Sequence, residues 1–207
     1  MRKSKLLSIF QTKKVEYNKL ILKCLVNGAK TTTQIAEYIY FNRKQKPKLR
    51  LHPKKVKEPD KNKIKSIVSI ISRKKSRLKE LETKYYIQKK NDLWYLTSPK
   101  GYAVAITLFN SVTEIYPYIP IEDLSEMFRR LHEIPIIDAF LNDERLRKIE
   151  DLSKSSQFLQ YMKDCTNELI NEGINIDKMS LEEFNVILSG KIAYILLKQL
   201  QVSWLKQ

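Results

Sequence analysis

One stretch of the chain, from Asn62 to Arg77, places hydrogen-bonding side chains and guanidinium groups at helical spacing. With successive residues about 100° apart, one face carries only polar and basic residues: Asn62, Lys65, Ser66, Ser69, Arg73, Ser76 and Arg77. Arginine can donate two parallel hydrogen bonds to guanine, while serine, asparagine and lysine can contact base edges or phosphates. The face has no acidic residue before Glu80. We therefore expect it to contact nucleic acid rather than to be an ordinary solvated face.

No group of residues in the sequence suggests catalysis. His52 and His132 have no cysteine or carboxylate at metal-ligand spacing, and the 4 glycines form no phosphate-binding loop. No Ser/His/Asp or Cys/His set can be assembled. The 2 cysteines, Cys24 and Cys165, lie on apolar faces of predicted helices, which favours reduced core thiols. We predict a protein that is not an enzyme and needs no cofactor or metal.

The charge of the chain is divided unevenly along its length. The formal net charge is +16; residues 1–100 hold 28 basic and 7 acidic side chains, and residues 101–207 hold 11 and 16. A basic excess of this size attracts phosphate backbones, and release of counterions supplies free energy of association. Charge alone does not separate nucleic acid from an anionic membrane surface, so the choice depends on the fold.

The elements that position the polar face follow from apolar periodicity and capping residues. Tyr17 to Leu25 has helical spacing and ends at Asn27-Gly28. A second, short helix begins at the capping box Thr31 to Gln34. A single long helix is predicted over residues 62–83, with one apolar stripe: Ile64, Ile67, Val68, Ile71, Leu78 and Leu81.

A hairpin and a further helix are predicted next. Residues 85–88 and 93–96 are rich in strand-forming residues and flank a turn at 89–92, where Lys89 and Lys90 are placed for phosphate contact. Ser98 as N-cap and Pro99 at the first helical position predict a helix through about Ile115.

A basic loop is predicted between the second and third helices, over residues 42–61. It contains nine basic residues and three prolines, with almost no apolar periodicity. One interpretation is an arm that follows the DNA backbone or enters the minor groove; the other is a passive insertion that adds only diffuse attraction. The first interpretation assigns phosphate contacts within the loop to Arg43, Lys44, Lys54, Lys55 and Lys57.

Two segments resemble winged helix-turn-helix regulators of the MarR-like and PadR-like families. Residues 77–87, RLKELETKYYI, resemble the end of the recognition helix running into the first wing strand, and residues 94–101, WYLTSPKG, resemble the second wing strand and the start of the next helix. The resemblance covers about residues 15–108. It implies a recognition helix at about 62–83 in the major groove and a homodimer on double-stranded DNA. Those families usually have glycine where this chain has Tyr85, so Thr83-Lys84 must make the turn or the helix must end differently.

The second half reads as entirely helical. Pro117 and Pro120 predict a boundary between a winged helix-turn-helix domain, residues 1–118, and an all-α region, residues 119–207, for dimerisation or partner binding. The fold class is thus mainly α with a small β-hairpin wing. Residues 192–197 are all apolar, so this helix either pairs with a second copy or is central to its own domain.

Two functions fit the sequence. The first is a sequence-specific transcriptional regulator; the second is a winged-helix assembly factor for replication, partition or protein docking, which binds DNA with little specificity and another protein through its acidic half. No apolar run approaches the roughly 20 residues needed to cross a bilayer, and no signal peptide is recognisable. We therefore expect a cytoplasmic protein without membrane contact.

Overall fold

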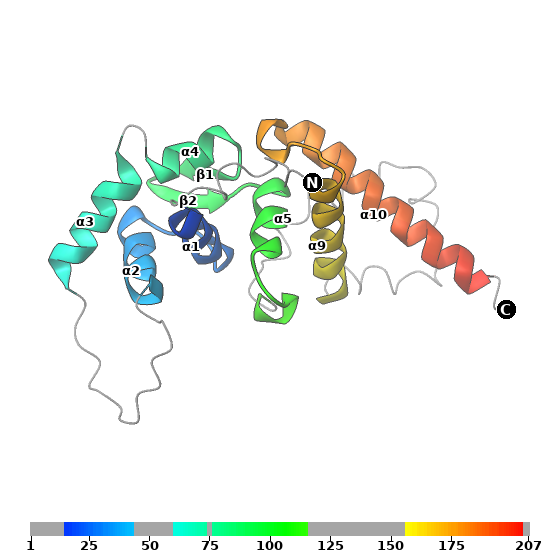
Figure 1. The fold of residues 1–207 in the computed structure, drawn as a ribbon, viewed down its shortest axis with the longest axis horizontal. Helices are drawn as coiled ribbons and strands as arrows, with labels where there is room; N and C mark the ends of the chain where they lie inside the picture. The colour runs from blue at the N-terminus through cyan, green and yellow to red at the C-terminus, as the bar shows by residue number, and fades with distance from the viewer. Residues whose placement is uncertain (1–14, 44–59, 74–75, 116–155, 205–207) are drawn as a thin grey trace, which may run out of the picture.

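The computed structural model describes residues 15–43, 60–73, 76–115 and 156–204, and these are mainly helical with one small antiparallel sheet (Figure 1). The predicted fold class, mainly α with a hairpin, is confirmed at this level. In Figure 1 the helix labelled α3 lies at one end of the molecule and α10 at the other. Most of the basic loop and the predicted boundary at 118 lie outside the described residues.

The first two helices form where the sequence predicts them. Helix α1, Val15–Val26, ends before Gly28, whose φ of 90° is favourable only for glycine. Helix α2, Thr32–Arg43, begins with the predicted capping box. The Gln34 amide donates to Thr31 Oγ1 at 3.2 Å, and the Thr31 amide donates to Gln34 Oε1 at 2.9 Å.

The predicted single helix over residues 62–83 is wrong, because two helices occupy this segment. Helix α3, Lys61–Ser72, is capped by Asp60, and helix α4, Arg77–Thr83, is capped by Ser76, whose Oγ accepts from the Lys79 amide at 3.3 Å. The backbone between them is extended at Arg73, with ψ of 163°. The break allows α3 to pack on α2 while α4 packs on α1 and the hairpin.

Helix α4 ends with a tyrosine in the conformation that glycine usually adopts. Tyr85 has φ of 58°; its amide donates to the Glu82 carbonyl at 2.9 Å, and the Tyr86 amide donates to the Leu81 carbonyl at 3.0 Å. This pair of hydrogen bonds is the Schellman arrangement. The helix therefore ends by the usual geometry without the usual residue.

The predicted hairpin is present. Strand β1, Ile87–Lys90, pairs with β2, Leu93–Leu96, and the two turn residues Asn91 and Asp92 have φ of 50° and 62°. A single-residue bridge adds the α1–α2 connection to the sheet: Lys30 and Trp94 exchange both backbone hydrogen bonds, at 3.1 and 2.9 Å.

Helix α5, Lys100–Thr107, packs very closely against the hairpin. A Cβ added to Gly101 would lie 2.1 Å from the Tyr86 carbonyl oxygen, so only glycine fits there. The predicted cap at Ser98 is wrong, because Thr97 Oγ1 accepts from the Gly101 amide at 3.1 Å instead. The helix is also shorter than predicted; after it comes a 3-10 turn, η2, Val112–Glu114.

The described part of the second half comprises α9, Ser156–Asn171, a 3-10 turn η5, Ile176–Lys178, and α10, Leu181–Trp204. The predicted capping box is present: the Glu183 amide donates to Ser180 Oγ at 3.1 Å. Helix α9 packs against α5, and the buried apolar residues of both halves join in one cluster.

The apolar run at residues 192–197 is divided between core and surface. Ile192, Ala193 and Leu196 are buried, whereas Tyr194 is 67% exposed. The run therefore contributes one side to the chain's own core and leaves Tyr194 on the surface. Among the described residues, no helix combines the length and apolarity needed to cross a membrane.

Candidate nucleic-acid interface

Helix α3 separates its apolar and polar residues onto two sides. Ile64, Ile67 and Ile71 are buried, with Ile71 fully inaccessible. The predicted contact residues of this helix lie on the other side: Asn62, Lys65, Ser66 and Arg73 are exposed and Ser69 is half-buried. Helix α3 contains no acidic residue. Its outer surface can therefore approach a phosphate backbone with no carboxylate of the helix itself opposing it.

Several hydroxyl groups on this surface already donate within the helix. Ser66 Oγ donates to the Asn62 carbonyl at 3.0 Å, and Ser72 Oγ donates to the Val68 carbonyl at 2.7 Å. Arg73 Nε donates to Ser69 Oγ at 3.0 Å, which orients the guanidinium at the carboxyl end of α3. The side chains best suited to base recognition are thus Asn62 and Arg73.

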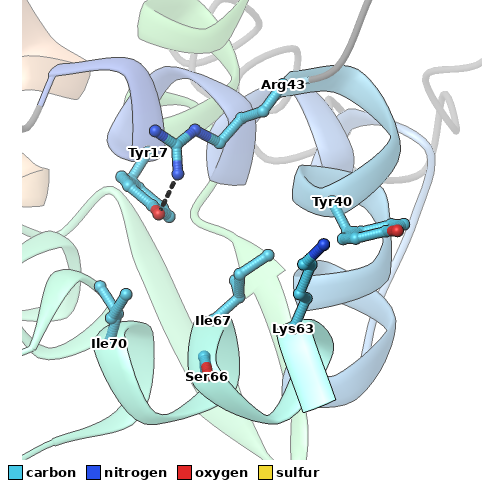
Figure 2. A pocket seen from close by; sticks show the side chains of 7 residues that line it. All are labelled: Tyr17, Tyr40, Arg43, Lys63, Ser66, Ile67 and Ile70. Atoms are coloured by element: carbon cyan, nitrogen blue, oxygen red, sulfur yellow. Dashed lines mark hydrogen bonds between the residues drawn. The ribbon is translucent and has the colours of Figure 1, made fainter. Parts of the chain in front are cut away.

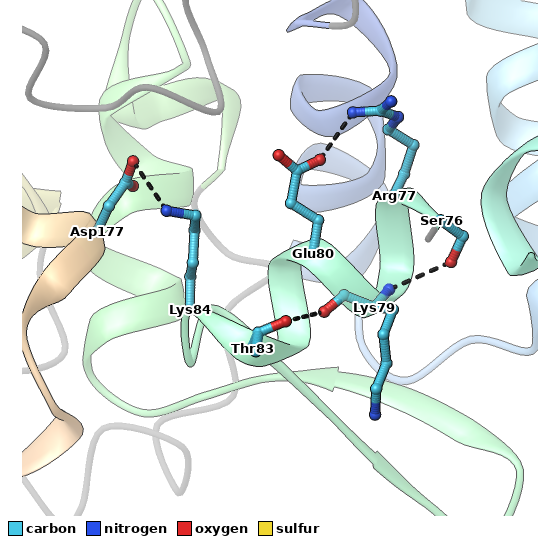
Figure 3. Close-up of polar contacts among 7 residues, drawn as sticks. All are labelled: Ser76, Arg77, Lys79, Glu80, Thr83, Lys84 and Asp177. Atoms are coloured by element: carbon cyan, nitrogen blue, oxygen red, sulfur yellow. Dashed lines mark hydrogen bonds and ion pairs between the residues drawn. The ribbon is translucent and has the colours of Figure 1, made fainter. Parts of the chain in front are cut away.

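Two of the predicted contact residues have structural roles instead. Ser76 is buried, 4% exposed, and caps α4. Arg77 Nη1 pairs with Glu80 Oε2 at 2.7 Å, and its side chain is 13% exposed (Figure 3). One continuous helix would place both on the outer face. Because α3 ends at Ser72 and α4 begins at Arg77, Ser76 and Arg77 turn toward the core instead.

The hairpin presents the two predicted lysines on exposed β1 positions. Lys89 pairs with Asp92 Oδ1 at 2.7 Å, and its Nζ lies 6.0 Å from the centre of the Trp94 ring. The hydrogen bond from Lys89 lowers the pKa of Asp92, so this carboxylate remains ionised. Lys90 is exposed beside the turn. Since Asp92 compensates Lys89, the hairpin offers less net positive charge than the sequence suggests.

A groove of about 420 Å³ lies between α1, α2 and α3 (Figure 2). Arg43, the described member of the predicted loop set, lies 4.5 Å over the Tyr17 ring, donates to the Tyr17 hydroxyl and pairs with Glu16 at 3.6 Å. Lys44, Lys54, Lys55 and Lys57 lie outside the described residues. The other residues that line the groove are Tyr40, Lys63, Ser66, Ile67 and Ile70.

Sequence reasoning did not include Lys61 and Lys63 among the contact residues, although both are exposed in the first turn of α3. They are cations adjacent to Asn62, which was included, and this adjacency was the available signal. Lys63 Nζ pairs with Asp60 Oδ2 at 3.2 Å, and its hydrogen bond lowers the pKa of Asp60. Lys63 is thus partly neutralised by the residue that caps the helix.

A polar junction, consisting of Lys84, Tyr86, Lys100 and Asp177, connects the base of the hairpin to η5. The Tyr86 hydroxyl donates to Asp177 Oδ1 at 2.6 Å, and Lys84 Nζ pairs with Asp177 Oδ2 at 3.4 Å (Figure 3). Lys100 Nζ donates to the Met179 carbonyl at 2.6 Å. Asp177, Tyr86 and Lys100 are all buried, so this junction ties α4, the hairpin and α5 to the second half of the chain.

Burial shapes the chemistry of the junction. It lowers the pKa of Lys100 to about 8, although the nearby Asp177 acts in the opposite direction. Burial, reinforced by the charge of Asp177, raises the pKa of Tyr86, so this phenol keeps its proton. The junction lies in the core, which suits a structural role better than a binding role.

The predicted core thiols are confirmed. Cys24 and Cys165 are both free and buried, and burial raises the pKa of each to about 11. Within the described ranges, no three His, Cys, Asp or Glu side chains come together as a candidate metal site.

Comparisons of the chain with protein-family models, with curated proteins and with solved structures found no match. The functional interpretation therefore depends on the geometry and chemistry of the described residues.

Proposed function

We propose that this chain is a DNA-binding transcriptional regulator of the winged helix-turn-helix type, with α3 as the helix that enters the major groove. The observation that carries the proposal is the outer surface of α3, which combines cations with small hydrogen-bonding groups and has no carboxylate within the helix. Twelve residues give a helix about 18 Å long. Such a helix fits a major groove roughly 12 Å wide.

The surrounding elements support this orientation. The buried side of α3 packs on α2, which leaves its polar side outward. The hairpin is held to the α1–α2 connection by the Lys30–Trp94 bridge and to α2 by a hydrogen bond from Trp94 Nε1 to Thr32 Oγ1 at 3.1 Å. A rigid hairpin of this kind is suited to carry Lys90 to a phosphate beside the groove.

A second candidate is an assembly factor that binds DNA with little sequence preference. It is favoured by the loss of Ser76 and Arg77 from the outer surface and by the local hydrogen bonds of Ser66 and Ser72. Fewer side chains then remain to distinguish one base from another, whereas phosphate contacts are unaffected.

The first test measures phosphate contact. Lys65→Ala should weaken binding to all duplexes and reduce the slope of log K against log salt by about 0.9, because one phosphate contact is lost. Lys178→Ala is the matched control: it removes the same charge from an exposed position in η5 and should leave the slope unchanged. Equal effects of the two variants would mean that α3 is not the contact surface.

The second test separates the two candidates. A preferred sequence is first selected from random DNA with the intact protein. Arg73→Ala should then cost about 1–3 kcal/mol on that sequence and much less on random DNA if Arg73 contacts a base. An equal loss on both would favour the assembly factor. Unfolding curves should be unchanged within about 0.5 kcal/mol, because Arg73 is exposed.

A further inference from the structure

The polar residues that lie opposite the buried stripe of α3 form one row. With successive residues about 100° apart, Ile64, Ile67 and Ile71 are centred on one side of the helix. Within about 40° of the opposite side lie residues at spacings of four, three and four: Asn62, Ser66, Ser69 and Arg73. This row therefore faces directly away from the core.

Exposed cations lie on both flanks of the row. Lys61 and Lys65 are on one flank, and Lys63 is on the other. A helix in the major groove lies between the phosphates of two strands, so this layout presents cations to both walls of the groove. Because Lys63 pairs with Asp60 at 3.2 Å, the more strongly charged flank is that of Lys61 and Lys65.

Asn62, at the start of the row, has a side chain that is available to a base. Its backbone amide donates to Asp60 Oδ1 at 3.1 Å, and its carbonyl accepts from Ser66 Oγ at 3.0 Å. Its side-chain amide, by contrast, has no hydrogen-bond partner within the described residues. A free side-chain amide matches adenine, which offers an acceptor and a donor side by side in the major groove.

Arg73, at the other end of the row, is held through only one of its nitrogen atoms. Its Nε donates to Ser69 Oγ at 3.0 Å, while its two Nη groups have no partner in the part of the chain that the structure describes. Two N–H groups in this forked arrangement match O6 and N7 of guanine. Ser69 therefore orients the guanidinium and leaves its fork available.

The middle of the row is short, which allows the helix to lie close to the floor of the groove. The hydroxyls of Ser66 and Ser69 already have partners within α3 and Arg73, respectively. Arg73 follows Asn62 by 11 positions, which corresponds to about 16.5 Å along the helix. Along a groove inclined to the DNA axis, this length covers roughly three to five base pairs of about 3.4 Å each.

We propose that α3 recognises a DNA duplex in which Asn62 contacts an adenine and Arg73 contacts a guanine roughly three to five base pairs away. Ser69 is the positioning residue for Arg73, and the base pairs between the two contacts are selected weakly. This assignment rests on the proposed function, since it names the bases that the outer surface of α3 selects.

The first experiment selects preferred sequences from random duplexes with the intact chain and then measures binding to single-base variants of the selected site. Changing the adenine or the guanine should each weaken wild-type binding roughly 5- to 150-fold, and changing a pair between them less than about threefold. A selected site without such a pair of bases would overturn the assignment but not the regulator. Selection of no sequence at all would overturn both.

The second experiment assigns each base to its residue. Asn62→Ala should abolish discrimination at the adenine and keep it at the guanine, and Arg73→Ala should do the reverse. Asn62→Gln carries the same amide and should retain the adenine preference. If either alanine variant loses both preferences equally, or loses neither, the assignment is wrong.

The third experiment tests the positioning of Arg73. Ser69→Ala should reduce the guanine preference about two- to tenfold and leave the adenine preference unchanged, because Arg73 loses the group that orients it. Ser72→Ala is the matched control: it removes a hydroxyl that donates to the Val68 carbonyl outside the row, and it should change neither preference. Equal effects of the two variants would overturn the role of Ser69.

Discussion

The outer surface of α3 and the polar junction both contain lysines, but in opposite surroundings. On α3, Lys61 and Lys65 are exposed on a helix without acidic residues. In the junction, Lys100 is buried and donates to a carbonyl near the carboxylate of Asp177. A buried charge must be compensated within the fold, whereas an exposed and uncompensated charge is available to a partner. Substitutions should therefore affect stability at the junction and binding at α3.

The largest loss of stability is expected beside the junction, at Gly101. Gly101→Ala places a Cβ 2.1 Å from the Tyr86 carbonyl oxygen, and backbone must move to relieve this contact. We expect a loss of roughly 3 kcal/mol or more in chemical denaturation. Gly190→Ala is the matched control, because its Cβ meets nothing within 4 Å. It should not destabilise the dilute protein. A Gly101→Ala variant as stable as the wild type would contradict the close packing of α5 on the hairpin.

Asp177→Asn should have the next largest effect. It replaces a buried carboxylate by a neutral amide, so the hydrogen bond from Tyr86 loses its charged acceptor and the ion pair with Lys84 is lost. We expect a loss of about 3 kcal/mol in the free energy of unfolding. Glu172→Gln, which breaks an exposed pair with Lys191, should cost less than about 1 kcal/mol. If the two variants behave alike, the junction is no more important for stability than a surface ion pair.

The pH dependence of stability should reveal Lys100. Its pKa is lowered from 10.5 to about 8 in the folded chain, so between these values the unfolded chain binds more protons. This group therefore makes stability rise with pH above about 8, by on the order of 1 kcal/mol per pH unit at most. Lys100→Met should remove the rise. The useful window ends near pH 9, because Cys24 and Cys165, whose pKa values burial raises from 9.0 to about 11, reverse the trend above it.

The contribution of Lys100 to the pH dependence of stability can be isolated because the charged groups around it stay the same in the variant. Lys84, Asp177 and Glu183 are the charged groups that act on it, and none is altered in Lys100→Met. Denaturation curves of the wild type and the variant at about pH 7.5, 8 and 9, within this window, give the comparison directly. Parallel pH profiles would show that Lys100 is not the titrating group.

The smallest effect should have the opposite sign. Tyr85→Gly replaces a residue with φ of 58° by one that adopts this conformation freely, so it should stabilise the chain by about 0.5–1 kcal/mol. Thermal unfolding measures the gain. Loss of the ring, which lies 5.8 Å from Lys100 Nζ, opposes it. A net loss would show that this ring contact outweighs the backbone strain.

The sequence predicted the elements that depend on local signals. The capping boxes at Thr31 and Ser180, the stop at Gly28 and the hairpin around Asn91 all involve residues within a few positions of one another. Such signals act in the same way whatever the rest of the chain does.

The break between α3 and α4 left no mark on the apolar pattern. Ile71 and Leu78 are seven residues apart, so the stripe remains in register across the break. Ser76 satisfied both interpretations, since a serine is suitable on a solvated face and as an N-cap. The sequence therefore correctly placed Asn62, Lys65, Ser66 and Arg73 at exposed positions. It was wrong to place Ser76 and Arg77 on the same exposed face, because Ser76 is buried and the Arg77 side chain is 13% exposed.

The polar junction could not have been found from local patterns. The Tyr86 hydroxyl and Asp177 are 91 positions apart in the sequence, and no periodicity relates them. Only the packing of η5 against the hairpin brings them together, and this depends on tertiary contacts across the whole chain.

The bridge between Lys30 and Trp94 has a consequence for how freely this sequence can change. Both of its hydrogen bonds join main-chain atoms, so the lysine side chain plays no part in them. Nineteen amino acid types carry the required N–H, and proline alone lacks it. The residue at position 30 can therefore be substituted by most amino acids during evolution without loss of the strand pairing. Relatives could then keep this architecture although the side chain at this position differs.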